Sequence, residues 1–222
     1  MFTGIVEAKG YIERVKRQGT DLSLSIDTGE LDLRDVKLGD SIAVNGVCLT
    51  AVSLLKRGFV ADVSAESLIH TNIASFSVGT AVNLEKALTL AARIGGHLVS
   101  GHVDGIGTIV DIINDGRSVR FEVACANEIE KYIAAKGSIS VDGVSLTVTT
   151  IKPGGFCLNI VPHTMGNTIL PEYKKGALVH LEVDLIARYT ERLLNAEGGQ
   201  SKGNNSAMSE EFLSRHGFMG RR

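Results

Sequence analysis

Apolar and polar residues alternate with a period of two along most of the chain, in short runs separated by glycines. This alternation is typical of half-buried β-strands. It predicts strands on both sides of residues 45–46 and, in the same half of the chain, at 3–12, 22–26, 58–63 and 80–86. Helical periodicity is scarce, so the pattern predicts an all-β protein of small barrels or sandwiches.

The chain contains an internal repeat with a period of 97 residues. At this shift residues 41–85 are identical to residues 138–182 at 14 of 45 positions, without a gap. Gly4, Val6 and Gly10 likewise fall on Gly101, Val103 and Gly107. The period exceeds that of solenoid repeats, so we expect two homologous domains, at residues 1–97 and 98–184, and the same strands in both.

Asn-Gly and Asp-Gly pairs occupy the same place in the two copies. Asn45–Gly46 and Asp142–Gly143 each stand between valines. Both central residues of a type I′ turn need a positive φ angle, which Asn, Asp and Gly tolerate. Each pair therefore predicts a tight β-hairpin.

Three segments favour helices. Ser64 is expected to cap a turn over residues 65–71, and Asn127–Glu130 has the form of a capping box for a short helix that Gly137 can end. After Asp184 the apolar residues take a helical period, which predicts a helix over 185–196. The polar, glycine-rich residues 197–222 are expected to be a flexible tail, with room for one short helix at 209–216.

The composition excludes several classes of function. The 23 basic and 25 acidic residues give a net charge of −2 without a basic block, so no nucleic-acid partner is expected. Charged residues interrupt the apolar stretches, which argues against a membrane span, and Met1–Glu7 lacks the features of a signal peptide. Three scattered cysteines suit neither a disulfide framework nor a zinc site. We therefore expect a cytoplasmic protein.

Small hydrogen-bonding side chains follow the tight turn in each half. Strand alternation places Cys48 and Thr50 on one face of their strand, and Ser145 and Thr147 repeat the arrangement. An isolated Ser-x-Thr on a strand usually faces water. Its recurrence in both copies instead favours a polar site in each.

The stretch Gly95–Gly105 contains two histidines, His97 and His102. Their spacing of five residues puts them on opposite faces of a regular strand, and no cluster of further ligands completes a tetrahedral site, so no metal is expected. A lone histidine is usually packed or solvated, although Gly101 can let a flat ligand approach the backbone beside His102. Gly105-Ile-Gly107 lacks the third glycine and the βαβ context of a dinucleotide site.

Five segments, in order and spacing, resemble the riboflavin synthase family. They are Met1–Val6, Val44–Thr50, Val82–Ala87, Gly95–His102 and Asp142–Thr147, and the resemblance covers about residues 1–195. It implies two tandem Greek-key β-barrels plus a C-terminal α-helix. Each barrel is expected to bind one 6,7-dimethyl-8-ribityllumazine, and the helix to join three chains in a homotrimer.

The resemblance also implies a reaction without a cofactor. Two lumazine molecules become riboflavin and 5-amino-6-(D-ribitylamino)uracil by transfer of a four-carbon unit. Candidates for proton transfer or nucleophilic addition are Cys48, His102, Ser145, Thr147 and Asp184. Which of them is the base and which adds to the ring stays open.

The substrate-binding residues that the resemblance implies fall into two groups. The N-terminal pocket is expected to contain Gly4, Ile5, Val6, Cys48, Leu49, Thr50, Asp62, Val63, Ser64, Ala65, Glu66 and Ser67. The C-terminal pocket is expected to contain Gly101, His102, Val103, Ser145, Leu146, Thr147, Val161, Pro162, His163, Thr164, Met165 and Gly166, with Lys136 nearby.

The main alternative is an optical protein that binds lumazine or flavin without turnover. Such relatives are expected to lose polar site residues in one half, whereas Cys48, His102 and Ser145 are all present here, which favours an enzyme. An oligonucleotide-binding barrel would need a basic groove with exposed aromatic residues, and only 5% of the residues are aromatic.

Overall fold

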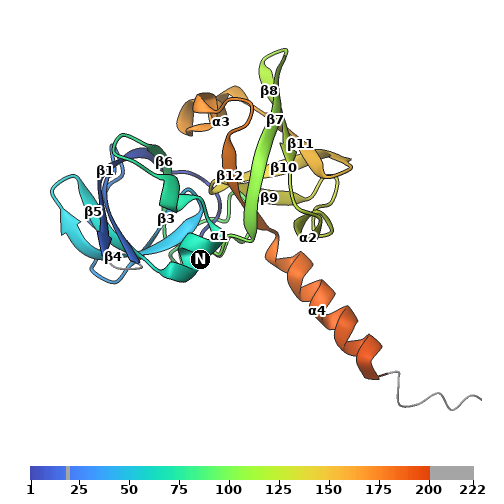
Figure 1. The fold of residues 1–222 in the computed structure, drawn as a ribbon, viewed down its shortest axis with the longest axis horizontal. Coiled ribbons are helices and arrows are strands. Elements are labelled where there is room, and N and C mark those ends of the chain that lie inside the picture. The colour runs from blue at the N-terminus through green and yellow to red at the C-terminus, as the bar shows by residue number, and fades with distance from the viewer. Residues whose placement is uncertain (19–20, 201–222) are drawn as a thin grey trace, which may run out of the picture. The chain divides into compact units, whose positions relative to one another are not determined.

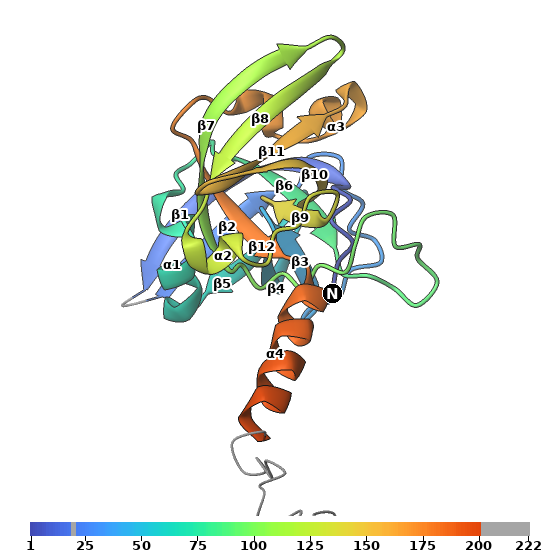
Figure 2. The ribbon, with the colours of Figure 1, turned by 90° about the vertical axis from the view of Figure 1, so that its right-hand side faces the viewer.

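The computed structural model describes residues 1–18 and 21–200, which form two closed barrels of β-strands and a few helices (Figures 1 and 2). The first barrel contains β1 (Ala8–Gln18), β2 (Asp21–Asp27), β3 (Ser41–Val44), β4 (Val47–Leu55), β5 (Gly58–Val63) and β6 (Ala81–Lys86), with α1 (Ala65–His70) and the 3-10 turn η1 (Ile73–Ser75) between β5 and β6. The second contains β7 (Gly105–Asp115), β8 (Ser118–Ala124), β9 (Ser138–Val141), β10 (Val144–Lys152), β11 (Gly155–Ile160) and β12 (Leu178–Val183), with α2 (Asn127–Glu130), α3 (Pro162–Asn167) and η2 (Leu170–Glu172).

The strand order confirms the Greek-key prediction. In the first barrel the order around the sheet is β1-β2-β5-β4-β3-β6, all neighbours being antiparallel. Strands β3, β4 and β5 follow one another, and β6 returns to lie beside β3, which is the Greek-key arrangement. The second barrel repeats this order, and every first-barrel element recurs 97 residues later.

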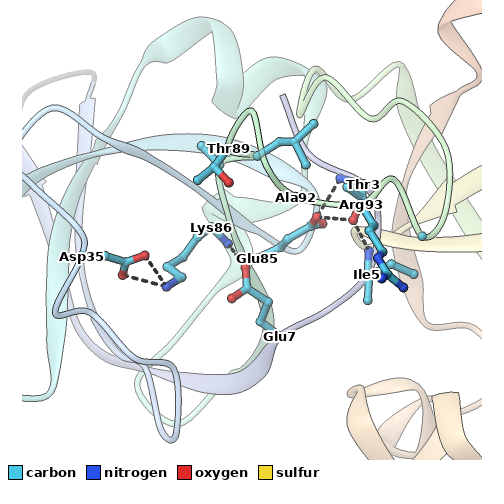
Figure 3. Close-up of a pocket in the computed structure, with 12 residues that line it drawn as sticks. Thr3, Ile5, Glu7, Asp35, Glu85, Lys86, Thr89, Ala92 and Arg93 are labelled. Atoms are coloured by element: carbon cyan, nitrogen blue, oxygen red, sulfur yellow. Dashed lines mark hydrogen bonds and ion pairs between the residues drawn. The ribbon is translucent and has the colours of Figure 1, made fainter.

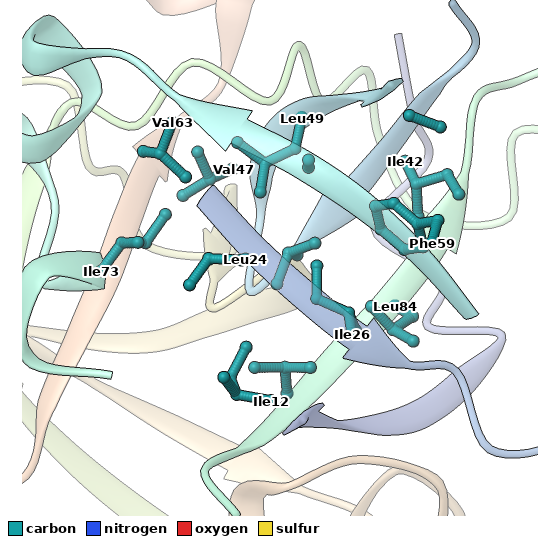
Figure 4. Packing of buried hydrophobic residues seen from close by; sticks show 14 of the residues in the cluster. Ile12, Leu24, Ile26, Ile42, Val47, Leu49, Phe59, Val63, Ile73 and Leu84 are labelled. Atoms are coloured by element: carbon teal, nitrogen blue, oxygen red, sulfur yellow. The ribbon is translucent and has the colours of Figure 1, made fainter. Parts of the chain in front are cut away.

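The inward-facing residues of the strands fill each barrel. Figure 4 shows this packing in the first barrel, where Phe59 and Leu84 lie among aliphatic side chains. The equivalent Phe156 and Leu181 are buried in the second barrel. Because each sheet closes on itself, the described strands leave neither barrel with an unpaired edge.

Both predicted tight turns are confirmed by their backbone angles. Asn45 and Gly46 have φ angles of 46° and 77°, and Asp142 and Gly143 have φ angles of 43° and 79°. The two turns also meet each other, since a Cβ atom built on Gly46 would lie 2.7 Å from the backbone nitrogen of Gly143. The hairpin tips therefore join the two barrels by direct backbone contact.

The predicted strand at residues 3–12 is wrong at both ends, because β1 runs from Ala8 to Gln18. Gly4 has a φ angle of 74°, which breaks the strand, and Phe2 pairs with Val99. Val6 then packs against the core of the second barrel. Its repeat equivalent, Val103, packs against the core of the first. The segment that precedes each barrel thus completes the other barrel.

The helix predictions have mixed outcomes. Ser64 caps α1 as predicted, since its Oγ accepts a hydrogen bond from the Ser67 N–H at 3.2 Å. The capping box at Asn127 is wrong: α2 is a single turn that Asn127 already belongs to, and no side chain caps it.

The C-terminal helix α4 spans Leu185–Gln200, four residues beyond the predicted end, so 197–200 are helical rather than a flexible tail. Its apolar residues Ile186, Tyr189 and Leu193 are exposed. The remaining tail, including the short helix predicted at 209–216, lies outside the described residues. No described helix is long and apolar enough to cross a membrane.

We predict that Gly46→Ala destabilises the protein more than Gly116→Ala does. Both glycines have positive φ angles, but a Cβ on Gly116 would meet nothing within 4 Å. Gly116→Ala should cost about 1 kcal/mol for the left-handed conformation, and Gly46→Ala a further ~1–3 kcal/mol for the clash with Gly143. Urea unfolding of both variants measures the difference, and equal losses would contradict the close contact of the turns.

Candidate functional site

The first candidate site is a cavity of about 260 Å³ beside the β3–β4 turn. It is lined by Val47, Cys48, Glu66, Ser67, His70, Thr71, Gly101, His102 and Val103. The backbone N–H of Cys48 donates to the Gly101 carbonyl at 2.9 Å, which fixes the approach of this segment. A Cβ on Gly101 would lie 2.5 Å from the Cys48 Cβ, so only glycine fits here.

This arrangement corrects the predicted grouping of Gly101–Val103. The sequence placed these residues with Ser145 in the second half, whereas the structure places them with Cys48 in the first. His70 was missed, although it lies one helical turn after Glu66, and its Nε2 is 3.0 Å from the Glu66 Oε1. That i,i+4 spacing was the signal in the sequence that could have found it.

The second candidate site surrounds Ser145 and receives the N-terminal segment. The Ser145 N–H donates to the Gly4 carbonyl at 2.7 Å. A Cβ on Gly4 would lie 2.6 Å from the Ser145 Cβ, so this contact requires glycine. The sequence prediction grouped Gly4–Val6 with Cys48 in the first half. The structure instead places this segment beside Ser145 of the second barrel.

His97 contacts Ser145 directly and is the main residue that the sequence prediction missed. Its Nδ1 lies 2.7 Å from the Ser145 Oγ, and the residue is 8% exposed. The Nε2 atom is buried and has no hydrogen-bond partner among the residues that the structure describes. Gly96 makes this possible, because a Cβ there would lie 2.7 Å from the Ser145 Oγ.

Burial lowers the pKa of His97 below its ordinary value, while the negative charge of Asp184 acts in the opposite direction. A neutral imidazole within hydrogen-bonding distance of a hydroxyl can exchange a proton with it. His97 and Ser145 therefore form a candidate proton-transfer pair, and Asp184 acts on this pair electrostatically.

Lys136 is held in a backbone conformation that L-residues rarely adopt. Its φ angle is 65°, and the repeat equivalent Gly39 has a φ angle of 92°. Both residues make the same backbone hydrogen bond, to the carbonyls of Val148 and Ala51 respectively. A lysine at a position where glycine would be unstrained is a candidate for function.

The other predicted residues differ in what they present to a ligand. Leu49, Val63 and Leu146 are buried in the barrel cores, which leaves their backbone atoms for contact. Thr50 and Thr147 are exposed on the same strand faces as Cys48 and Ser145. The predicted residues Val161–Gly166 contain most of α3, which holds the place in the second barrel that α1 holds in the first.

A larger hollow of about 460 Å³ lies around the N-terminal segment (Figure 3). Its lining includes Glu85 and the ion pair between Lys86 and Asp35, but neither Cys48 nor Ser145. Among the described residues, no group of three or more His, Cys, Asp and Glu side chains could hold a metal ion.

Comparison with known families first defines the class of protein. A sequence model of the lumazine binding domain matches residues 3–87 and again residues 100–184. The two barrels are therefore two lumazine-binding domains in one chain.

Curated relatives define the family more closely. Riboflavin synthase from Photobacterium phosphoreum is 46% identical over 99% of this chain and 100% of the relative. That from Bacillus subtilis (strain 168) is 39% identical over 98% of this chain and 100% of the relative. The chain belongs to the riboflavin synthase family, as the motifs in the sequence indicated.

Solved structures share the fold. The structure of LumP complexed with riboflavin has a TM-score of 0.77 at 23% identity, covering 82% of this chain and 99% of that one. LumP complexed with 6,7-dimethyl-8-(1'-D-ribityl) lumazine has a TM-score of 0.75 over the same shares of the two chains.

We predict that His97 makes the stability of the protein sensitive to acid. Unfolded His97 takes up a proton near its ordinary pKa of about 6.5, whereas the folded site resists protonation until a lower pH. The free energy of unfolding should therefore fall as the pH drops from about 6.5 through the lowered pKa. Urea unfolding across this range should show a smaller loss in His97→Gln, while the exposed His163→Gln should behave as the wild type. Equal slopes in all three proteins would show that the pKa of His97 is not lowered.

Proposed function

We propose that the protein is a riboflavin synthase that converts two molecules of 6,7-dimethyl-8-ribityllumazine into riboflavin and 5-amino-6-(D-ribitylamino)uracil. The observation that supports this most strongly is full-length identity of 39–46% to riboflavin synthases, together with a polar site beside the hairpin turn of each barrel. The four carbons that one lumazine loses are gained by the other, so the reaction consumes no oxidant or reductant, and we propose no cofactor.

The 7-methyl group of the lumazine is a carbon acid, and its deprotonation precedes formation of a carbon–carbon bond. In the Ser145 site, neutral His97 is suited to accept the hydroxyl proton of Ser145 at the observed 2.7 Å. Lys136 can stabilise negative charge that develops on the ring. In the Cys48 site, Cys48 and His102 are the proposed reactive groups, and Thr147 and Asp184 remain further candidates in the second half.

The duplication of the binding domain suits a reaction between two identical molecules. We propose the domains at residues 1–97 and 98–184 as one lumazine site each. Holding two molecules as a near-attack pair replaces a rare bimolecular encounter with a step inside one complex.

We also propose a homotrimer in which α4 joins the chains. Ile186, Tyr189 and Leu193 are between 64% and 66% exposed and recur at helical spacing, which is the pattern of a helix that packs on a partner. Each productive site would then combine the Cys48 site of one chain with the Ser145 site of its neighbour.

We propose a cytoplasmic location as well. The three cysteines are free, which suits the reducing cytoplasm.

An optical protein is the second candidate function, since the LumP structures share the fold. Two observations favour an enzyme. The relatives at 39–46% identity are synthases, and His97 is paired with Ser145 in a way that binding alone does not require.

We predict that the purified protein forms riboflavin from the lumazine alone, in the presence of a metal chelator and without nucleotides. Riboflavin fluorescence measures the product. The Cys48→Ala/Ser145→Ala double variant, purified in parallel, controls for host enzyme carried through purification. Tight lumazine binding without product would instead support the optical protein.

We predict that inactive chains complement each other. Cys48→Ala impairs the first site of every chain and Ser145→Ala the second, so each homotrimer should lose most of its activity. Mixed trimers, made by unfolding and refolding the two variants together, should pair intact sites across some interfaces and exceed the average of the parents. The parents refolded separately and then combined are the control. No gain despite verified subunit exchange would place the reaction within a single chain.

A further inference from the structure

Two buried glutamates occupy equivalent positions in the repeat, and neither lines the Cys48 cavity or contacts Ser145. Glu85 lies on β6 and Glu182 on β12, and they are 6% and 4% exposed. Neither faces a lysine or arginine within ion-pair distance among the described residues. Each carboxylate instead accepts hydrogen bonds from a segment that precedes a barrel.

Glu85 holds the N-terminal segment with three hydrogen bonds, and Figure 3 shows the two that Thr3 donates. Its Oε1 accepts from the Thr3 N–H at 2.6 Å and from the Thr3 hydroxyl at 2.7 Å, and its Oε2 accepts from the Gly4 N–H at 2.9 Å. Glu182 makes the same set, with Ser100 at 2.6 and 2.7 Å and Gly101 at 3.0 Å. The same three hydrogen bonds therefore occur at equivalent positions in both halves, which makes them part of the repeated fold and not an accident of one loop.

The clamped residues lead directly to the candidate reactive residues of the opposite barrel. Gly4, whose N–H is bound by Glu85 of the first barrel, accepts the N–H of Ser145 in the second. Gly101, whose N–H is bound by Glu182 of the second barrel, accepts the N–H of Cys48 in the first. Each glycine thus links a glutamate of one barrel to the candidate reactive residue of the other.

We propose that Glu85 positions Ser145 and that Glu182 positions Cys48, so that each barrel holds the segment that completes the other barrel's site. The proposal rests on the proposed function only in treating Ser145 and Cys48 as reactive residues. The glutamates touch no substrate and are positioning residues.

A glutamate suits this task better than its amide. All three partners of each carboxylate are donors, so both oxygens must accept. Glutamine at either position would turn an N–H group toward an N–H group and leave buried donors unpaired. Burial raises the pKa of both glutamates above the ordinary value, and the hydrogen bonds from the clamped segments oppose this rise.

The test compares Glu85→Gln with Glu182→Gln, each serving as the matched control of the other. Hydrogen exchange measured by NMR reports the hydrogen bonds of the Ser145 and Cys48 amides without any ligand. Glu85→Gln should lower the protection of the Ser145 amide about tenfold, the factor for one weakened hydrogen bond, and leave the Cys48 amide unchanged. Glu182→Gln should do the reverse. The exposed Glu13→Gln should alter neither amide.

Kinetics supply the second readout. The effects on kcat/KM of riboflavin formation are compared in double variants. The effect of Glu85→Gln should be non-additive with that of Ser145→Ala, because both changes act on the position of Ser145, and additive with that of Cys48→Ala. Should a Gln variant fail to fold, Thr3→Ala and Ser100→Ala remove one bond from each clamp and carry the same expectations. The proposal is overturned if Glu85→Gln affects the Cys48 amide, or both amides equally. If the amides respond as expected but no riboflavin forms, the proposed function fails and the positioning role stands.

Discussion

The contact between the two hairpin turns is the constraint on which both candidate sites depend. Gly46 and Gly143 meet at a backbone distance that leaves no room for a side chain. Around them, Asn83 donates to the Asp142 carbonyl at 2.9 Å, and the His180 Nδ1 lies 2.8 Å from the Asn45 carbonyl. Because the Nε2 of His180 accepts the Asn72 N–H, its Nδ1 must carry the proton. Asn83 and its repeat equivalent, the neutral His180, thus play the same part. Each donates one hydrogen bond to the turn of the other half and accepts one backbone N–H from the other half.

This contact between the turns determines where the candidate reactive side chains lie. Cys48 and Ser145 each come two residues after the glycine of their turn, on the strand that leaves the turn. Their backbone N–H groups are bound by Gly101 and Gly4, which the other barrel holds in place. A disturbance of the contact between the turns is therefore expected to reach both sites together, whereas a disturbance of one clamp reaches a single site.

The features that the sequence predicted correctly are local or repeated. Asn45–Gly46 specifies its turn by the φ angles of two residues, and one repeat period places every strand of the second barrel once the first is known. The exchange of Gly4 and Gly101 between barrels was not predictable in this way, because it depends on Glu85 and Glu182, each more than 80 residues distant in the chain. The contact of His97 with Ser145 was not predictable for a related reason. Its burial against Ser145 follows from tertiary packing at Gly96, and nothing in its neighbours along the chain indicates a hydroxyl partner.

The two halves share a backbone but differ in chemistry, which is what the proposed reaction needs. Two identical lumazines must take unlike roles, one losing four carbons and the other gaining them. A perfect duplication would present both with the same groups. Here Cys48 stands where the second half has Ser145, and Ile5 stands where the other exchanged segment has His102. The repeat therefore gives the two halves the same backbone frame, and a few substitutions within it give them the unlike groups that the proposed reaction would need for a donor and an acceptor.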